Sequence, residues 1–173
     1  MSDLFDLINY DSFRSVWFWI FMALAWNSIC HWTLSVPFDE LIRAERRGGD
    51  HLRWVEETAH AASGRFVFAF QRGGPWIVAF AFFFTAMIVT FALVFRFELA
   101  QAAAAFGVPL LAQTASETIA AHRVRRENLR GKKLIRFLAW RRFYHQLIAL
   151  LSFFLAGIGL LWNAAMELNA IWG

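Results

Sequence analysis

Few side chains in this sequence could do chemistry, and most of them lie beside apolar stretches. His31 ends one such stretch and His145 begins another, so the two imidazoles are expected at similar depth if both stretches cross a membrane. Two histidines in facing helices could ligate a b-type haem. With Cys30 and Glu117 at a related depth, a metal ion is the other alternative. Interfacial histidines more commonly hydrogen-bond to backbone or lipid, so we expect no cofactor and no metal.

Three polar side chains interrupt the apolar stretches: Asn27, Gln113 and Glu117. Ionisable groups at membrane depth are costly and often functional. In a homo-oligomer these three could line a path for an ion or solute. Glu117 lies close to a basic segment, however, and we expect it to pair with Arg123 or another nearby arginine.

The motifs of soluble enzymes are absent from the sequence. It contains no Gly-rich phosphate loop, nucleophile elbow, Cys-x-x-Cys or His-Glu-x-x-His. Gly48-Gly49 and Gly73-Gly74 are interpreted as helix ends. One cysteine could not by itself hold an ordinary cysteine-ligated iron–sulfur cluster. We therefore expect a protein that is not an enzyme.

The last apolar stretch carries small or polar residues at alternating intervals of three and four. Such a stripe forms one helix face, and in a bilayer small faces let helices approach closely. Packing within the chain is the expected use, and docking of a partner helix or a second copy is the alternative. The stripe consists of Ala149, Ser152, Ala156, Gly159 and Asn163.

The elements that must position these residues follow from composition. The chain has 173 residues, of which 59% are hydrophobic and 18% aromatic, more than a soluble domain of this size can bury. A bilayer core of about 30 Å needs roughly 20 apolar residues in a helix. We predict an all-α, polytopic membrane helix bundle forming one domain over residues 1–173. Its four transmembrane helices span about 15–36, 75–95, 98–121 and 143–166, with loops at 37–74 and 122–142.

The orientation follows from basic residues, which collect in cytoplasmic loops. Only Arg14 and Arg96 lie outside the two predicted loops, so the loops are assigned to the cytoplasm and both termini to the periplasm of a bacterial inner membrane. The first loop carries Arg43, Arg46, Arg47, Arg53, Arg65 and Arg72. The second carries Arg123, Arg125, Arg126, Arg130, Lys132, Lys133, Arg136, Arg141 and Arg142.

Both loops show further patterns. From about Asp50 to Gln71 apolar residues recur at helical spacing, which predicts an amphipathic helix lying on the inner leaflet. The second loop is expected to continue the fourth helix inward. Its basic side chains should contact anionic lipid headgroups rather than nucleic acid. The lipid-facing set is Arg125, Arg126, Arg130, Lys132, Lys133 and Arg136.

Trp17-Phe18-Trp19, followed by His31-Trp32-x-Leu34-x-Val36-Pro37-Phe38-Asp39, resembles the opening of a family of small four-span alphaproteobacterial proteins. Members are often labelled as a component of the Suf iron–sulfur cluster assembly complex, which implies a membrane-bound accessory here. Trp54-Val55-Glu56-Glu57 is also similar to a Trp-x-Glu-Glu motif in the small subunit of tripartite periplasmic transporters. The termini predicted for this chain, however, face the opposite side of the membrane from those of that family.

The sequence as a whole favours a non-catalytic accessory or assembly protein of the inner membrane. Such a protein would present its helices to a membrane-protein partner, or to further copies of itself, and its basic loops to the cytoplasm. The alternatives are a homo-oligomeric small channel or transporter subunit, and a haem- or metal-binding redox protein.

Overall fold

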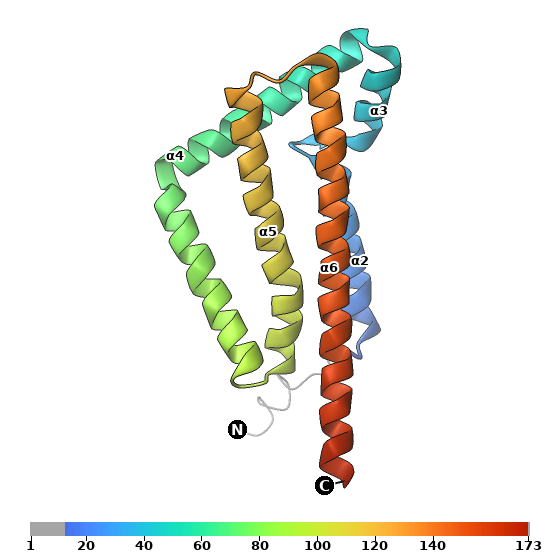
Figure 1. The fold of residues 1–173 in the computed structure, drawn as a ribbon, viewed down its shortest axis with the longest axis vertical. Coiled ribbons are helices and arrows are strands. Elements are labelled where there is room, and N and C mark those ends of the chain that lie inside the picture. Colours follow the sequence, from blue (N-terminus) through green and yellow to red (C-terminus); the bar gives the residue numbers. More distant parts are fainter. Residues whose placement is uncertain (1–12, 173) are drawn as a thin grey trace.

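The computed structural model describes residues 13–172, and these residues are almost wholly helical (Figure 1). The predicted all-α class is confirmed. Figure 1 shows α2, the second half of α4, α5 and α6 running along the long axis, with α3 and the first half of α4 at one end. In order, the elements are α2 (Val16–His31), β1 (Trp32–Thr33), β2 (Val36–Pro37), α3 (Phe38–Arg47), α4 (Gly49–Leu93), α5 (Glu98–Arg126) and α6 (Gly131–Trp172).

The first helix is shorter than predicted. It ends at His31 instead of reaching residue 36, and β1 and β2 then pair antiparallel. Leu34 and Ser35 form the turn between the strands with φ values of 47° and 61°. Positive φ at both turn positions is typical of a two-residue hairpin, although Asn-Gly is the usual sequence there. Leu34 is only 2% exposed, and burial of its side chain offsets the local strain.

The predicted break at Gly73-Gly74-Pro75 is wrong, because α4 continues through it for 45 residues. A proline inside a helix removes one hydrogen bond and crowds the preceding turn, which bends the helix without always ending it. Figure 1 shows such a change of direction about midway along α4. The first half of α4 therefore crosses the end of the bundle, and the second half descends beside α5.

Residues 13–172 form two hydrophobic cores. The first lies in the segment that we call the cap, residues 32–72 together with 118–142. Its buried members come from the hairpin, α3, α4, α5 and α6: Leu34, Val36, Leu41, Ala44, Val55, Ala59, Ala62, Ala120, Ala121, Val124, Leu134, Ile135 and Leu138. The second lies between α2, α5 and α6 and includes Phe13, Met22, Trp26, Ala102, Ala105, Ala149 and Ala156.

The amphipathic half of α4 does not use its apolar face as predicted. Val55, Ala59 and Ala62 are almost fully buried in the cap core rather than being turned toward a leaflet. Full burial of a side chain the size of valine stabilises a fold by about 1.5 kcal/mol or more. This apolar face therefore packs α4 against the ends of α5 and α6, while Trp54 and Phe68 remain exposed.

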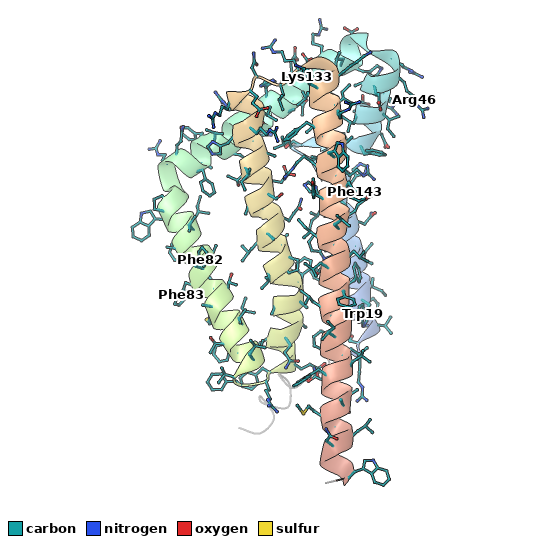
Figure 2. The ribbon with its side chains drawn as sticks, in the orientation of Figure 1. Trp19, Arg46, Phe82, Phe83, Lys133 and Phe143 are labelled. Atoms are coloured by element: carbon teal, nitrogen blue, oxygen red, sulfur yellow. The ribbon has the colours of Figure 1, made fainter. Side chains whose placement is uncertain are left out.

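Within the described residues, α4 and α6 are long and apolar enough to cross a membrane. Only 6% of the most apolar window of α4, and 11% of that of α6, is buried inside the protein. Figure 2 shows Phe82 and Phe83 projecting outward from α4, and both side chains are more than half exposed. These helices thus present apolar side chains outward instead of filling a core.

Candidate functional site

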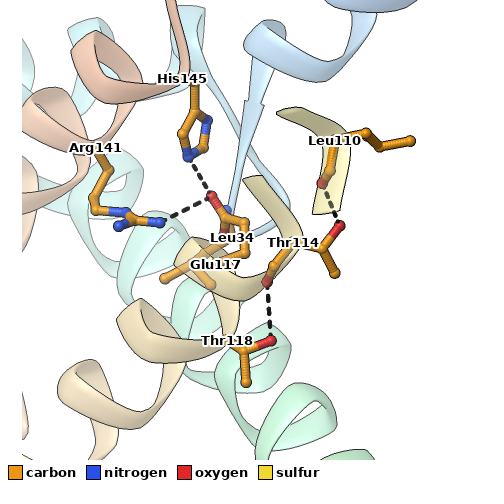
Figure 3. Close-up of polar contacts among 7 residues, drawn as sticks. All are labelled: Leu34, Leu110, Thr114, Glu117, Thr118, Arg141 and His145. Carbon is orange, nitrogen blue, oxygen red and sulfur yellow. Dashed lines mark hydrogen bonds and ion pairs between the residues drawn. The ribbon is translucent and has the colours of Figure 1, made fainter. Parts of the chain in front are cut away.

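The candidate site is a buried charged cluster around Glu117, where the bundle meets the cap (Figure 3). Oε1 of Glu117 lies 2.7 Å from Nε2 of His145 and 3.8 Å from Nη2 of Arg141. Its Oε2 accepts a hydrogen bond from the backbone N–H of Leu34 at 3.3 Å. One carboxylate therefore joins α5, α6 and the hairpin that follows α2.

Local helical geometry explains how the cluster is assembled. Arg141 and His145 are four residues apart on α6, so they share one face and both point toward α5 (Figure 3). The turn at Leu34 brings a backbone donor to the opposite side of the carboxylate. The suggested partner Arg123 instead bonds Glu127 through Nε at 3.0 Å. These two exposed residues are also an i,i+4 pair, and the helix surface brings them together without tertiary structure.

The cluster is deeply buried. The side chain of His145 is 0% exposed, and those of Glu117 and Arg141 are 12% exposed. The Glu117–His145 contact is an ion pair when the imidazole is protonated, but its atoms are not aligned as a hydrogen bond. Buried charges are tolerated only when paired, and loss of one partner is strongly destabilising. The arrangement is suited to holding α5, α6 and the β1–β2 hairpin together.

The structure does not bring the candidate haem ligands together as a pair facing a gap. The ring of His31 packs edge-on against Trp32 with centroids 5.7 Å apart, whereas His145 contacts Glu117. Cys30 is half-buried and takes part in neither contact. Among the described residues, no group of three or more histidine, cysteine or acidic side chains is placed to hold a metal ion.

The candidate path residues occupy different environments. Asn27 is exposed on α2, while Gln113 is 4% exposed on α5. Nearby hydroxyls are used within their own helix: Thr114 donates to the carbonyl of Leu110 and Thr118 to that of Thr114 (Figure 3). Asn27 therefore lies on the outer surface of the chain, whereas Gln113 lies in its interior.

The small stripe of α6 packs within the chain. Ala149, Ser152 and Ala156 are buried, and the hydroxyl of Ser152 donates to the carbonyl of Ala105 on α5 at 2.7 Å. Further along the same face, the amide of Asn163 donates to Oε1 of Gln101 at 2.7 Å. A Cβ atom added at Gly159 would lie 2.7 Å from Cζ of Phe13, so the helix is in close contact there as well.

Two polar contacts made by side chains of α4 were not predicted from the sequence. Oε1 of Glu56 accepts the backbone N–H of Gly131, the first residue of α6, at 2.6 Å. Nε2 of His60 lies 3.0 Å from the carbonyl oxygen of Leu129. The four-residue spacing of Glu56 and His60 was the available signal, because it places both on one helix face beside buried Val55 and Ala59.

A third missed contact involves Arg142. Its guanidinium carbon lies 3.4 Å from the ring centroid of Phe38, a cation–π contact between α6 and the start of α3. The Arg142–Phe38 contact and the contacts of Glu56 and His60 together connect α3 and α4 to the α5–α6 hairpin.

Comparison of the chain with protein-family models, curated proteins and solved structures finds no match in any of the three.

Proposed function

We propose that this chain is a four-span protein of a bacterial inner membrane. Its crossings are α2, the second half of α4, α5 and the middle of α6. The outward apolar surfaces of α4 and α6 support this assignment. The 42 residues of α6 extend about 63 Å, well over a bilayer core of about 30 Å, so this helix would emerge at both faces. The 16 residues of α2 reach about 24 Å, a mismatch that local thinning accommodates.

The charge distribution supports cytoplasmic placement of the cap and periplasmic placement of the termini, of which the first twelve residues lie outside the described range. Arg96 lies in the turn between α4 and α5 and Arg14 lies just before α2, both toward the end of the bundle away from the cap, and the other fifteen basic residues belong to the cap (Figure 1). Figure 2 shows Arg46 and Lys133 at the cap end. All but Arg141 and Arg142 of those fifteen are exposed.

Within that membrane, the role we propose is a non-catalytic accessory or assembly protein. The observation that carries it is that a bundle containing two long apolar helices supports a separately packed, basic cap. The Glu117 cluster joins the cap to the helices, and the contacts of Glu56 and His60 hold the two parts of the cap to each other. Such a platform can offer a fixed cytoplasmic surface to a larger complex while the exposed helices contact membrane-embedded subunits. The resemblance of the first forty residues supports Suf iron–sulfur cluster assembly as the setting.

Topology is testable because the chain has one cysteine. In a Cys30→Ser background, a membrane-impermeant maleimide applied to intact spheroplasts should label Arg96→Cys and leave Arg46→Cys unlabelled until the membrane is opened. Both positions are exposed, so accessibility of the side chain is matched. Labelling of Arg46→Cys alone before lysis would reverse the orientation, and recovery of the protein without detergent would overturn the membrane assignment.

The accessory role is tested by purifying a tagged copy from native membranes in mild detergent, followed by native gel electrophoresis, mass spectrometry and a visible spectrum. Stoichiometric recovery with a larger complex is expected, and the recovered subunits would identify the pathway. An identically tagged, unrelated four-span protein is the control. A colourless protein that runs alone as a uniform homo-oligomer would overturn the accessory role, as would a haem absorption band.

A further inference from the structure

A bay of about 480 Å³ lies between the cap ends of α5 and α6. Four of the side chains that line it are cationic: Arg123, Lys133, Arg136 and Arg141. Among the described residues that line the bay, the one acidic side chain is that of Glu127, which Arg123 contacts at 3.0 Å. The bay therefore keeps a surplus of positive charge after its internal ion pair is counted.

The deepest of these cations also has unused donors. Nε and Nη2 of Arg141 are buried without a hydrogen-bond partner in the part of the chain that the structure describes. Its nearest carboxylate, on Glu117, is 3.8 Å away and in closer contact with His145. Buried donors without an acceptor are costly. Both atoms are closed to the bay, so Arg141 contributes to it an incompletely paired positive charge.

The lining changes in character along one face of α6. Lys133 and Arg136 are nearest the end of the helix, followed by Trp140 and then Tyr144, at intervals of three or four residues. From Lys133 to Tyr144 the axial rise is about 16 Å. Both aromatic side chains are more than half exposed, as is Ile119 on the α5 side. Interfacial Trp and Tyr side chains mark the level of the headgroups, with acyl chains beyond them.

We propose that this bay is a binding site for one anionic phospholipid of the inner leaflet. The phosphate would be held by Lys133 and Arg136, with the positive charge of Arg141 beneath them, and the acyl chains would run past Trp140 and Tyr144. Basic pockets between helices on the cytoplasmic side of a membrane are suited to such headgroups. The inference rests on the proposed membrane placement of the chain, and it adds one stoichiometric lipid site to the general attraction of a basic surface.

The test uses the full chain, extracted in mild detergent and examined by native mass spectrometry with added dioleoyl phosphatidylglycerol or dioleoyl phosphatidylcholine. We expect one phosphatidylglycerol to be retained preferentially. The double variant Lys133→Gln/Arg136→Gln should weaken that retention by on the order of tenfold or more, because each cation close to an anionic headgroup contributes severalfold to binding.

The matched control is Arg46→Gln/Arg47→Gln, which removes the same charge from exposed positions on α3 outside the bay. It should retain phosphatidylglycerol within about twofold of the parent, since distant exposed charges are screened. Equal losses in the two double variants, or equal retention of the two lipids by the parent, would overturn the site. Displacement of phosphatidylglycerol by an equal concentration of inorganic phosphate would also overturn it, in favour of a free-phosphate site.

Failure of this inference is distinguishable from failure of the proposed function. A protein that needs detergent for extraction but shows no lipid preference contradicts only the bay. Recovery without detergent contradicts the membrane placement on which both depend.

Discussion

Nε2 of His145 lies 2.7 Å from Oε1 of Glu117, and this buried pair connects α6 to α5 where the bundle meets the cap. The same carboxylate accepts the backbone N–H of Leu34, 83 positions earlier in the chain. Three segments that are distant in sequence thus depend on one side chain. This dependence makes the pair the most sensitive point of the fold and determines the first prediction.

Glu117→Gln should strongly destabilise the protein. The amide keeps the shape of the side chain but leaves Arg141 without a counter-charge in a buried site and removes the carboxylate that His145 contacts. Breaking a buried ion pair from one side costs about 3–5 kcal/mol. For a chain of this length that corresponds to a fall in Tm of roughly 6 °C or more, measured by thermal unfolding in detergent.

The control for this variant is Glu57→Gln, an exposed acid on α4 that should leave Tm within about 1 °C of the parent, because isolated surface charges contribute little. Combining Glu117→Leu with His145→Leu should cost less than the sum of the two single changes, since the residues contact each other. Additive losses would show that the pair is not coupled.

Glu56→Ala should loosen the connection between α5 and α6. The carboxylate of Glu56 caps the first N–H of α6 at 2.6 Å, and loss of a helix cap costs about 1 kcal/mol. Amide hydrogen exchange over residues 127–132 should accelerate about fivefold, given that loss in local stability. The neighbouring Glu57→Ala removes the same charge from an exposed position and should leave this segment unchanged. Equal acceleration in both variants would indicate a general charge effect instead of a cap.

The attachment of α3 to the start of α4 should weaken in acid. The pKa of Glu40 is lowered chiefly by its hydrogen bond with His51 and further by Arg43. A lowered carboxyl pKa means that the folded state favours the carboxylate. Its contribution is therefore complete above the ordinary glutamate pKa and is lost as pH falls through the lowered value in the folded protein.

This pH effect is checked by following thermal unfolding between about pH 6 and pH 3, across the range where glutamate titrates. Glu40→Gln should flatten the acid limb of the Tm profile, while Asp39→Asn, at the exposed adjacent position, should leave the limb as in the parent. An acid limb that is the same in the parent and Glu40→Gln would refute the contribution of this contact.

Much of the architecture was predictable from local pattern. Apolar runs long enough for helices and the confinement of basic residues to two segments are properties of neighbouring residues, and they indicated an all-α chain with one basic end. The stripe on α6 was likewise visible as a periodicity of three and four. These signals survive in the structure because helix faces repeat on the scale of a few residues.

What could not be predicted depends on contacts between distant segments. Leu34 adopts a positive φ because the cap core buries its side chain, and no turn residue signals this. Glu117 has local arginines within reach, yet its partners come from a different helix. Gly73-Gly74-Pro75 has the composition of a helix end, but α4 continues through it, because a proline can bend a helix without ending it. For Leu34 and Glu117, contacts between distant segments outweigh the local signals.

The packing of α6 provides the last prediction, for which the chain offers a matched pair of glycines. A methyl group at Gly159 would lie 2.7 Å from Cζ of Phe13, a side chain that is 1% exposed. The backbone N–H of Phe13 is also fixed by Oε1 of Glu98 at 2.8 Å, so the ring has little freedom to withdraw. Gly159→Ala should therefore destabilise the fold by about 1–3 kcal/mol, as overpacking does.

Gly157→Ala, on the same helix, is the control, because a Cβ atom at Gly157 would meet no other atom within 4 Å. It should be neutral or should stabilise the protein by up to about 1 kcal/mol through helix propensity alone. Thermal unfolding of the two variants in one detergent therefore compares an identical chemical change at two positions that differ only in the space around them. A Gly159→Ala protein as stable as Gly157→Ala would mean that Phe13 does not pack on α6. Other contacts would then have to form the core between α2, α5 and α6 at the end away from the cap.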